Sequence, residues 1–266
     1  MRAAALAILL TADLSFSESF NAQLQSTHTL LMNAAHADDE SPIGPVFARY
    51  AREGVQVHMI VVTDGAQGGS NTSIPRGPEL AKVRAAEAQC AAAALGLKPP
   101  TILDFPDAKL GDFSADPALL YRVTARLAQE LERLRPDAIV TWGPDGGMGH
   151  PDHRIVSNLV TQLVRAGAPG APQRLYYMNI PPEGFRAVYP ERGVPPFLVP
   201  DAKHLTVRIS FAPEDFAAAQ RAMTCHRSQY TGEVIRRVVD VMERTWNGAI
   251  PLMSAFDPTP KTDLFR

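Results

Sequence analysis

The sequence predicts an α/β fold, with a mostly parallel sheet covered by helices on both faces. Strand-like and helix-like segments alternate without a break from residue 29 to residue 165, a pattern typical of a doubly wound sheet. The strand-like runs at 29–35 and 55–62 end in nearly continuous apolar residues, as parallel strands do when both of their faces are buried. We therefore expect one Rossmann-like, three-layer α/β/α domain.

The composition fits this expectation. A chain of 266 residues that is 45% hydrophobic can bury one substantial core. Its 26 basic and 28 acidic side chains are scattered, so no electrostatic footprint for nucleic acid is visible. Cys90 and Cys225 permit at most one disulfide and lack the spacing of zinc ligands. Cys90 lies in an alanine-rich helical segment, where we expect a packed core thiol.

The first 27 residues are expected to precede the fold. Met1-Arg2 and the apolar run at 3–10 have the basic start and the hydrophobic region of a secretory signal peptide, and the run is too short to span a membrane. Ala12 and Ala22 are candidate cleavage positions, although neither has a small residue two positions earlier. We expect export to the periplasm or medium and no stable membrane insertion; a surface helix or a misassigned start codon, with a cytoplasmic protein, is the alternative.

The remaining elements follow from periodicity and from proline and glycine signals. Helices are expected at 41–53, 78–95, 117–135, 152–165, 214–223 and 233–246, and further strands at 101–105, 137–142, 176–179 and 205–209. The first of these helices is expected to begin at Ser41-Pro42, as N-cap and first turn. The proline-rich stretch 181–200 is expected to be an irregular insertion that shapes substrate entry. We expect 28–232 to form the functional domain and 233–266 to pack on it as a C-terminal helix and tail.

An acidic cluster follows the first expected strand, at His36-Ala37-Asp38-Asp39-Glu40. Three carboxylates and an imidazole within five residues repel one another unless a cation or bound protons offset the charge. Histidine and aspartate suit zinc or a similar divalent ion, and a carboxylate that does not bind the metal can act as a general base. The alternative is a solvated acidic helix start.

A second cluster follows the strand expected at 137–142. A glycine-rich loop leads there into His150-Pro151-Asp152-His153, with His150 near a helix cap and His153 in the first turn. Functional crevices in open α/β sheets lie at the carboxyl ends of the strands, and both clusters follow strands. The two clusters therefore predict one shared site, with capping or core roles for the histidines as the alternative.

These two segments resemble the motifs of the LmbE-like, or PIG-L, family of zinc-dependent N-deacetylases. This family includes N-acetylglucosaminyl-phosphatidylinositol deacetylases and enzymes of mycothiol and bacillithiol synthesis. Its Ala-His-Pro-Asp-Asp-Glu motif is similar to residues 35–40, with Ala37 in place of proline, and its Gly-His-Pro-Asp-His motif is intact at 149–153. The resemblance runs from about residue 29 to about residue 230.

The resemblance implies a set of metal ligands and catalytic groups. Zn²⁺ would be held by His36, Asp39 and His153, and Fe²⁺ or Co²⁺ would suit the same ligands. Asp38 would be the general base. His150 would be protonated and would stabilise the oxyanion or protonate the leaving amine, and Asp152 would set the tautomer or charge of a histidine.

Substrate contacts are implied at four further positions. Arg84, in an Arg-x-x-Glu pattern with Glu87, and Asp107 resemble residues that bind sugar hydroxyls in the family. His226 and Gln229 lie in a segment similar to the family's His-x-Ser-Gln. The alternatives are a solvated Arg84–Glu87 ion pair, a simple turn at Asp107 and a histidine that favours a helix C-terminus.

The expected function is therefore hydrolysis of the N-acetyl group of an N-acetylglucosaminyl-type substrate by metal-activated water. One alternative is an amidase of the same fold that acts on a larger amide conjugate. Another is a non-catalytic, metal-containing carbohydrate-binding protein, which the presence of Asp38 disfavours. A nucleotide-binding enzyme is disfavoured because the dinucleotide glycine fingerprint is missing. The sequence leaves the oligomeric state and the natural substrate open.

Overall fold

A computed structural model of the protein describes residues 28–112, 114–180, 182–188 and 200–266. The expected leader at 1–27 and residues 189–199 of the expected insertion lie outside the described residues. Seven strands form a sheet in the order β3-β2-β1-β4-β5-β7-β6. The strands are β1 (Thr29–Ala34), β2 (Gln56–Thr63), β3 (Thr101–Phe105), β4 (Ala138–Trp142), β5 (Leu175–Met178), β6 (Val207–Ser210) and β7 (Ala249–Ser254).

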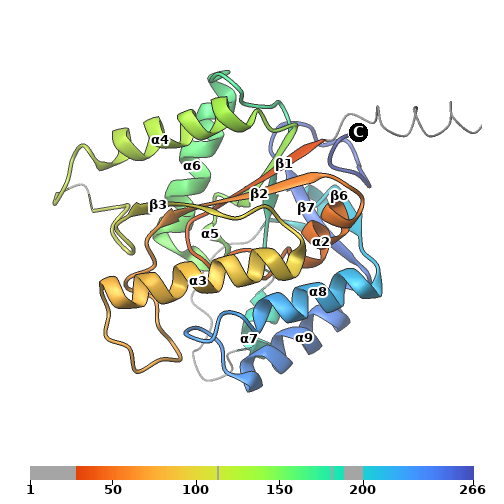
Figure 1. The fold of residues 1–266 in the computed structure, drawn as a ribbon. Coiled ribbons are helices and arrows are strands. Elements are labelled where there is room, and N and C mark those ends of the chain that lie inside the picture. The colour runs from red at the N-terminus through yellow and green to blue at the C-terminus, as the bar shows by residue number, and fades with distance from the viewer. Residues whose placement is uncertain (1–27, 113, 181, 189–199) are drawn as a thin grey trace, which may run out of the picture.

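Helices cover both faces of this sheet (Figure 1). The helices are α2 (Gly44–Arg52), α3 (Pro78–Leu95), α4 (Leu119–Leu134), α5 (Gly146–Gly149), α6 (Pro151–Arg165), α7 (Pro182–Val188), α8 (Pro213–Met223) and α9 (Gly232–Trp246). Helices α2, α3, α8 and α9 lie on one side, and α4 and α6 lie on the other. Among the described helices, none is both long enough and apolar enough to cross a membrane.

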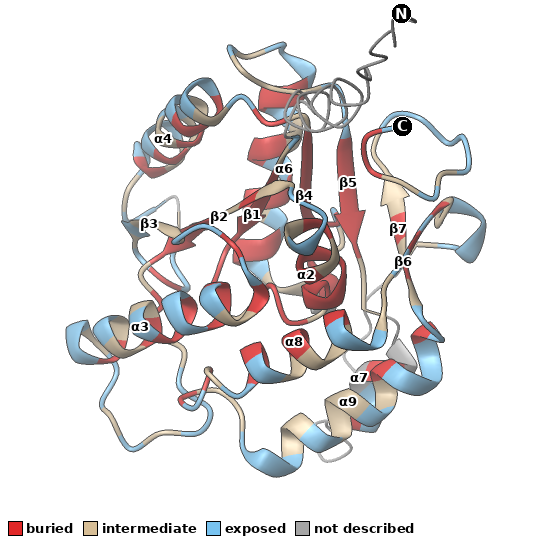
Figure 2. Cartoon of the chain, turned by 45° about the vertical axis from the view of Figure 1, so that its right-hand side comes forward, coloured by how far each residue is buried: buried red, intermediate tan, exposed pale blue. Residues whose placement is uncertain are grey.

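The strands are buried on both faces, which explains their apolar sequences (Figure 2). Along β1, Leu30 and Met32 belong to the core beneath α2, α3 and α8, whereas Leu31 belongs to the core beneath α4 and α6. Strands β1 to β5 pair in parallel, as the sequence predicts. The predicted three-layer α/β/α fold is confirmed.

The order of the strands creates a switch point between β1 and β4. The chain runs outward from β1 through β2 to β3, then returns to place β4 on the other side of β1. Connections after β1 and β4 therefore leave the sheet in opposite directions, which opens a crevice at their carboxyl ends. The two histidine and aspartate clusters begin at this crevice, because one follows β1 and the other follows β4.

Three sequence-based predictions were wrong in detail. The stretch 181–200 was expected to be irregular, but residues 182–188 form helix α7. The first helix was expected to begin at Ser41-Pro42, but α2 begins at Gly44 because residues 36–43 form turns. The C-terminal tail was given no element, yet β7 inserts between β5 and β6 and pairs antiparallel with both. Pro251 lies within β7, and a proline inside an apolar run argues against a strand.

The expectation of a packed thiol at Cys90 was also wrong. Cys90 is exposed on α3 and forms a disulfide with Cys225, which follows α8, with 5.7 Å between their Cα atoms. The alanine-rich sequence suggested burial, but position 90 lies on the side of α3 that meets the end of α8. The disulfide joins positions 135 residues apart, and Cys225 directly precedes His226 and the segment that reaches the site.

Replacing both cysteines with serine is expected to lower the free energy of unfolding by about 2–5 kcal/mol, the usual cost of losing a native disulfide. Urea unfolding of the parent and of the Cys90→Ser/Cys225→Ser variant measures this difference. Adding a reductant should destabilise the parent by a similar amount and leave the variant unchanged. Two free thiols in the unreduced, unfolded parent would contradict the assignment of the disulfide.

Candidate metal and active site

The three residues expected to bind a metal converge at the switch point. His36 Nδ1 lies 3.0 Å from His153 Nε2, which lies 3.1 Å from Asp39 Oδ1, and the third separation, from His36 Nδ1 to Asp39 Oδ1, is 3.7 Å. Tetrahedral zinc with bonds of about 2.0–2.1 Å to nitrogen and oxygen places its ligand atoms roughly 3.3 Å apart. The observed triangle therefore fits a zinc-sized ion, and all three side chains are buried.

Other donors lie on the opposite edge of the His36 ring. Carboxylate oxygens of Asp107 and Asp152 lie 3.2 and 3.4 Å from His36 Nε2, and these three residues form a group that could hold a metal. His36, His150 and His153 form another such group. The Asp152 carboxylate, however, already accepts the backbone N–H groups of Ala108 and Leu110 at 2.8 and 3.2 Å. We therefore assign Nδ1 of His36 to the metal side and Nε2 to the carboxylates.

The pKa values of His36 and Asp39 reflect an excess of negative charge around them. Burial lowers the pKa of His36, but hydrogen bonds to Asp107, Asp152 and Asp39 outweigh it and raise that pKa well above its ordinary value. Burial raises the pKa of Asp39, but the charge of His153 and hydrogen bonds to both histidines bring it well below its ordinary value. A cluster that holds a proton this tightly also favours a divalent cation in its place.

Asp38 lies beside this triangle and faces the cavity. Its carboxylate accepts hydrogen bonds from Arg84 Nη2 at 2.7 Å and from the Tyr230 hydroxyl at 3.1 Å. Burial acts to raise the pKa of Asp38, but the positive charge of Arg84 dominates among the groups that lower it below its ordinary value. Asp38 is thus an ionised carboxylate at neutral pH, held by two donors next to the three residues expected to bind a metal.

His150 differs from its expected state. Burial, followed by the charges of His153 and His36, lowers the pKa of His150 to about 4, so its ring is neutral at pH 7 rather than protonated. Its Nδ1 accepts the backbone N–H of Asp152 at 3.2 Å, which leaves the ring proton on Nε2. A neutral imidazole with this tautomer can still donate a hydrogen bond into the cavity that it lines.

Asp107 connects the metal side of the site to its rim. One carboxylate oxygen lies 3.2 Å from His36 Nε2, and the other accepts the backbone N–H groups of Gln67 and Gly68 at 2.8 and 3.0 Å. Burial acts to raise the pKa of Asp107, but its interactions with His36 and these further partners lower it to about 2. The ionised carboxylate therefore orients the His36 ring, besides lining the cavity where a substrate contact was expected.

Replacing Asp107 with asparagine is expected to weaken metal binding by about 10- to 100-fold, as happens when a carboxylate behind a histidine ligand is removed. Competition with a chelator of known affinity measures this change. Asp104→Asn removes the same charge from an exposed position of β3 and should leave the metal affinity unaltered. Equal affinities for the two variants would contradict the orienting role.

Arg84 occupies the wall that α3 presents to the site. Its guanidinium packs against the loop after β2, and a Cβ atom at Gly68 would lie only 2.1 Å from Arg84 Nη1. Glu87 does not pair with Arg84 but accepts the backbone N–H and the hydroxyl of Ser228 at 2.8 and 2.6 Å. The Arg-x-x-Glu pattern thus places one residue in the cavity and uses the other to anchor the segment after α8.

His226 is not placed as expected. Its side chain is fully buried, with Nε2 2.6 Å from a carboxylate oxygen of Glu40, and it does not line the cavity. The expectation of pocket contact was wrong because His226 ties the metal-binding turn to the segment after α8. Gln229 does line the cavity.

Among the cavity residues that sequence reasoning missed are two that contact expected functional side chains. Tyr230, which donates to Asp38, directly follows the recognised Ser228-Gln229 pair, so its position was a usable signal. Trp142 at the end of β4 stacks on the ring of His153, with 4.5 Å between ring centroids and 4° between planes. A strand-end tryptophan gave no sequence signal for this contact.

Comparison with known proteins places this geometry in context. Residues 31–164 match the family described as PIG-L, GlcNAc-PI de-N-acetylase. A 1D-myo-inositol 2-acetamido-2-deoxy-alpha-D-glucopyranoside deacetylase from Rhodococcus jostii is 31% identical over 247 residues, which cover 77% of this chain and 83% of the relative.

Solved structures share the fold at low sequence identity. The N,N'-diacetylchitobiose deacetylase from Pyrococcus horikoshii has a TM-score of 0.62 and 18% identity, covering 96% of this chain and 98% of its own. The 4-carboxy-2-hydroxymuconate hydratase from Pseudomonas putida KT2440 has a TM-score of 0.61 and 19% identity, covering 86% and 97%. A deacetylase and a hydratase therefore share this fold, so the fold alone does not specify the reaction.

Proposed function

The chain belongs to the PIG-L family of GlcNAc-PI de-N-acetylases, and from this premise we propose that it is a metal-dependent hydrolase of an N-acetylated amino sugar. The observation that carries the proposal is the triangle of His36, Asp39 and His153 with an ionised carboxylate, Asp38, beside it. This combination provides both an ion site and a base that is not a ligand.

A divalent ion bound to the triangle would polarise the amide carbonyl and lower the pKa of a water molecule. Side chains of the protein accept and donate the protons of the reaction. Asp38 accepts the proton of the attacking water and then delivers it to the leaving amine, while Arg84 and Tyr230 hold its carboxylate in place. The Nε2–H group of neutral His150 donates to the oxygen on which negative charge develops.

The polar rim suits a hydroxylated sugar ring. Gln67, Gly68 and Ser70 line the cavity on the side of β2, next to Arg84 and Asp107. Charged and amide groups at such a rim recognise hydroxyl groups and leave an apolar substrate without partners. This supports an amino sugar, as a small molecule or part of a glycan, over a wholly apolar amide.

We also propose that the protein is exported. The Cys90–Cys225 disulfide supports this proposal, because disulfides persist in oxidising compartments and are rare in reducing ones. Export also agrees with the sequence at residues 1–27, which is similar to a signal peptide.

Metal analysis combined with acetate release tests the proposed function. Protein purified without added metal is expected to carry about one divalent ion per chain by mass spectrometry and to release acetate from N-acetylglucosamine conjugates. Metal without hydrolysis of any conjugate would favour the carbohydrate-binding alternative. Absence of metal after reconstitution with Zn²⁺, Fe²⁺ and Co²⁺ would refute the proposal.

A further inference from the structure

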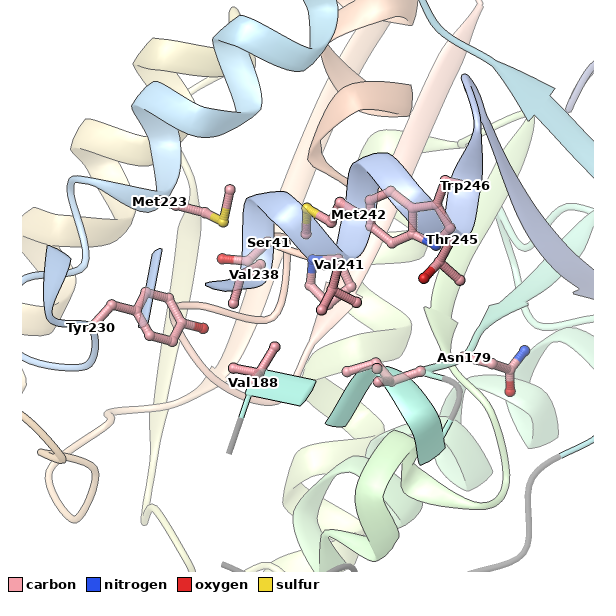
Figure 3. A pocket seen from close by; sticks show the side chains of 13 residues that line it. Ser41, Asn179, Val188, Met223, Tyr230, Val238, Val241, Met242, Thr245 and Trp246 are labelled. Atoms are coloured by element: carbon pink, nitrogen blue, oxygen red, sulfur yellow. The ribbon is translucent and has the colours of Figure 1, made fainter. Parts of the chain in front are cut away.

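A second cavity adjoins the active site and differs from it in chemistry. It lies between α7 and α9, and its described lining residues include no charged side chain (Figure 3). In Figure 3, Val188 of α7 faces Val238 and Val241 of α9, with Tyr230 at one end and Trp246 near the other. The cavity offers about 130 Å³ of space for the centres of water-sized molecules, and about 730 Å³ when all empty space and the solvent at its open mouth are counted.

This apolar cavity borders the active site. Pro42, Ile180 and Tyr230 line both cavities, so nothing thicker than these three side chains separates them. Tyr230 also donates to the proposed base, Asp38. A substituent on an amide at the metal triangle would therefore meet the apolar cavity at these three side chains.

The sheet places the polar and apolar walls on opposite sides of the metal triangle. The ligands follow β1 and β4, and the polar rim follows β2 and β3 on one side. Ile180 and α7 follow β5, on the other side. In a trans amide, the groups on the nitrogen and on the carbonyl carbon also lie on opposite sides of the C–N bond.

We propose that the apolar cavity binds the acyl chain of the substrate, so that the enzyme removes acyl groups longer than acetyl from an amino sugar. This inference rests on the proposed function and extends it. With the sugar on the polar rim and the carbonyl carbon at the metal triangle, the acyl chain extends toward Ile180 and α9. The amide C–N bond breaks, the acyl carbon gains the water oxygen to give a carboxylic acid, and the nitrogen takes the water proton to give the free amine.

Most of the described cavity wall lies outside the region that matches the family model, with Ser41 and Pro42 as the exceptions. Helix α9, which supplies Val238, Val241, Met242 and Trp246 to the wall, lies outside residues 31–164. The length of acyl chain that fits is therefore set by residues that the family motifs do not include.

A series of N-acyl glucosamines with acetyl, butanoyl, hexanoyl and octanoyl groups tests the proposal, because every member yields the same amine for quantification. Each methylene that enters the cavity should raise kcat/KM by about threefold to fourfold, until the cavity is full. Octyl N-acetylglucosaminide places the same chain on the opposite end of the substrate and should gain little over N-acetylglucosamine. A gain confined to this glycoside, or highest activity on the acetyl compound, would overturn the proposal.

A cavity-filling variant provides the matched test. Val241→Phe should lower the ratio of octanoyl to acetyl kcat/KM at least tenfold. Val239→Phe makes the same change on α9 but faces a separate groove beside α8, and it should leave this ratio unaltered. Thr245→Trp, at an exposed position of the same wall, is a second variant should Val241→Phe unfold, as thermal denaturation would reveal.

Binding of the product separates failure of this inference from failure of the proposed function. By isothermal titration calorimetry, octanoate should bind in a saturable way and at least tenfold more tightly than acetate, and Val241→Phe should weaken octanoate binding at least tenfold. Release of the amine from the acetyl compound without this binding of octanoate would overturn the acyl-chain site alone. Failure of the metal-loaded protein to cleave any member of the series would overturn the proposed function and this inference with it.

Discussion

Replacing Asp38 with asparagine is expected to lower kcat for N-acetylglucosamine conjugates by about a thousandfold while one metal ion per chain is retained. General-base catalysis by a positioned group contributes roughly 10²- to 10⁴-fold, and asparagine keeps the size of the side chain while losing its basicity. Asp38 is not one of the three residues of the metal triangle, so the ion should stay. Steady-state kinetics and metal analysis on the same preparation measure both effects.

Tyr230→Phe provides a milder change with which the loss of activity in Asp38→Asn can be compared. It removes one donor to Asp38 but leaves the carboxylate and its contact with Arg84, so a loss of about tenfold is expected, which corresponds to one hydrogen bond of ~1–1.5 kcal/mol. Turnover by Asp38→Asn within tenfold of the parent would show that another group accepts the proton.

Replacing both His36 and His153 with alanine is expected to abolish metal binding and to reduce hydrolysis by at least about a thousandfold. Two of the three ligands are lost, and the stabilisation of transition-state charge by a catalytic metal is worth several kcal/mol. Mass spectrometry of the purified variant measures the metal content independently of activity.

His204→Ala provides the control for the loss of an imidazole, because His204 is exposed and does not line the cavity. This variant should keep its metal and its activity. A His36→Ala/His153→Ala protein that still carries a stoichiometric ion would show that the metal occupies a different set of donors, with Asp107 and Asp152 as the first candidates.

The parts of the fold that repeat a local pattern were predictable from the sequence. The helix at 78–95 and the strand at 101–105 agree with the structure at both ends, because Pro78 starts the helix and Gly96 adopts a left-handed conformation just after its end. The placement of both motifs at strand ends was equally predictable, since it follows from alternating elements and from parallel pairing.

Two other features of the structure were not predictable. The start of α2 is shifted because the Asp39 carboxylate accepts the backbone N–H groups of Ala35 and His36 at 2.7 and 3.0 Å, which favours turns over a helical start at Ser41. The role of His226 depends on Glu40, which lies 186 residues earlier in the chain. The Asp39 contacts are local but do not alter the hydrophobic periodicity, and the contact between His226 and Glu40 has no local sequence signature.

The same separation in sequence has a consequence for how the protein folds. His36 follows β1 and His153 lies in α6, 117 residues later, so a single-ion site exists only when the central strands have paired. A metal with this preference is a ligand of the native state and barely of the unfolded chain, and at 100 times its dissociation constant it adds about 2.7 kcal/mol to the free energy of unfolding. The melting temperature should therefore rise with the concentration of free metal, and a chelator in the purification buffer would remove this contribution and leave only the stability that packing provides.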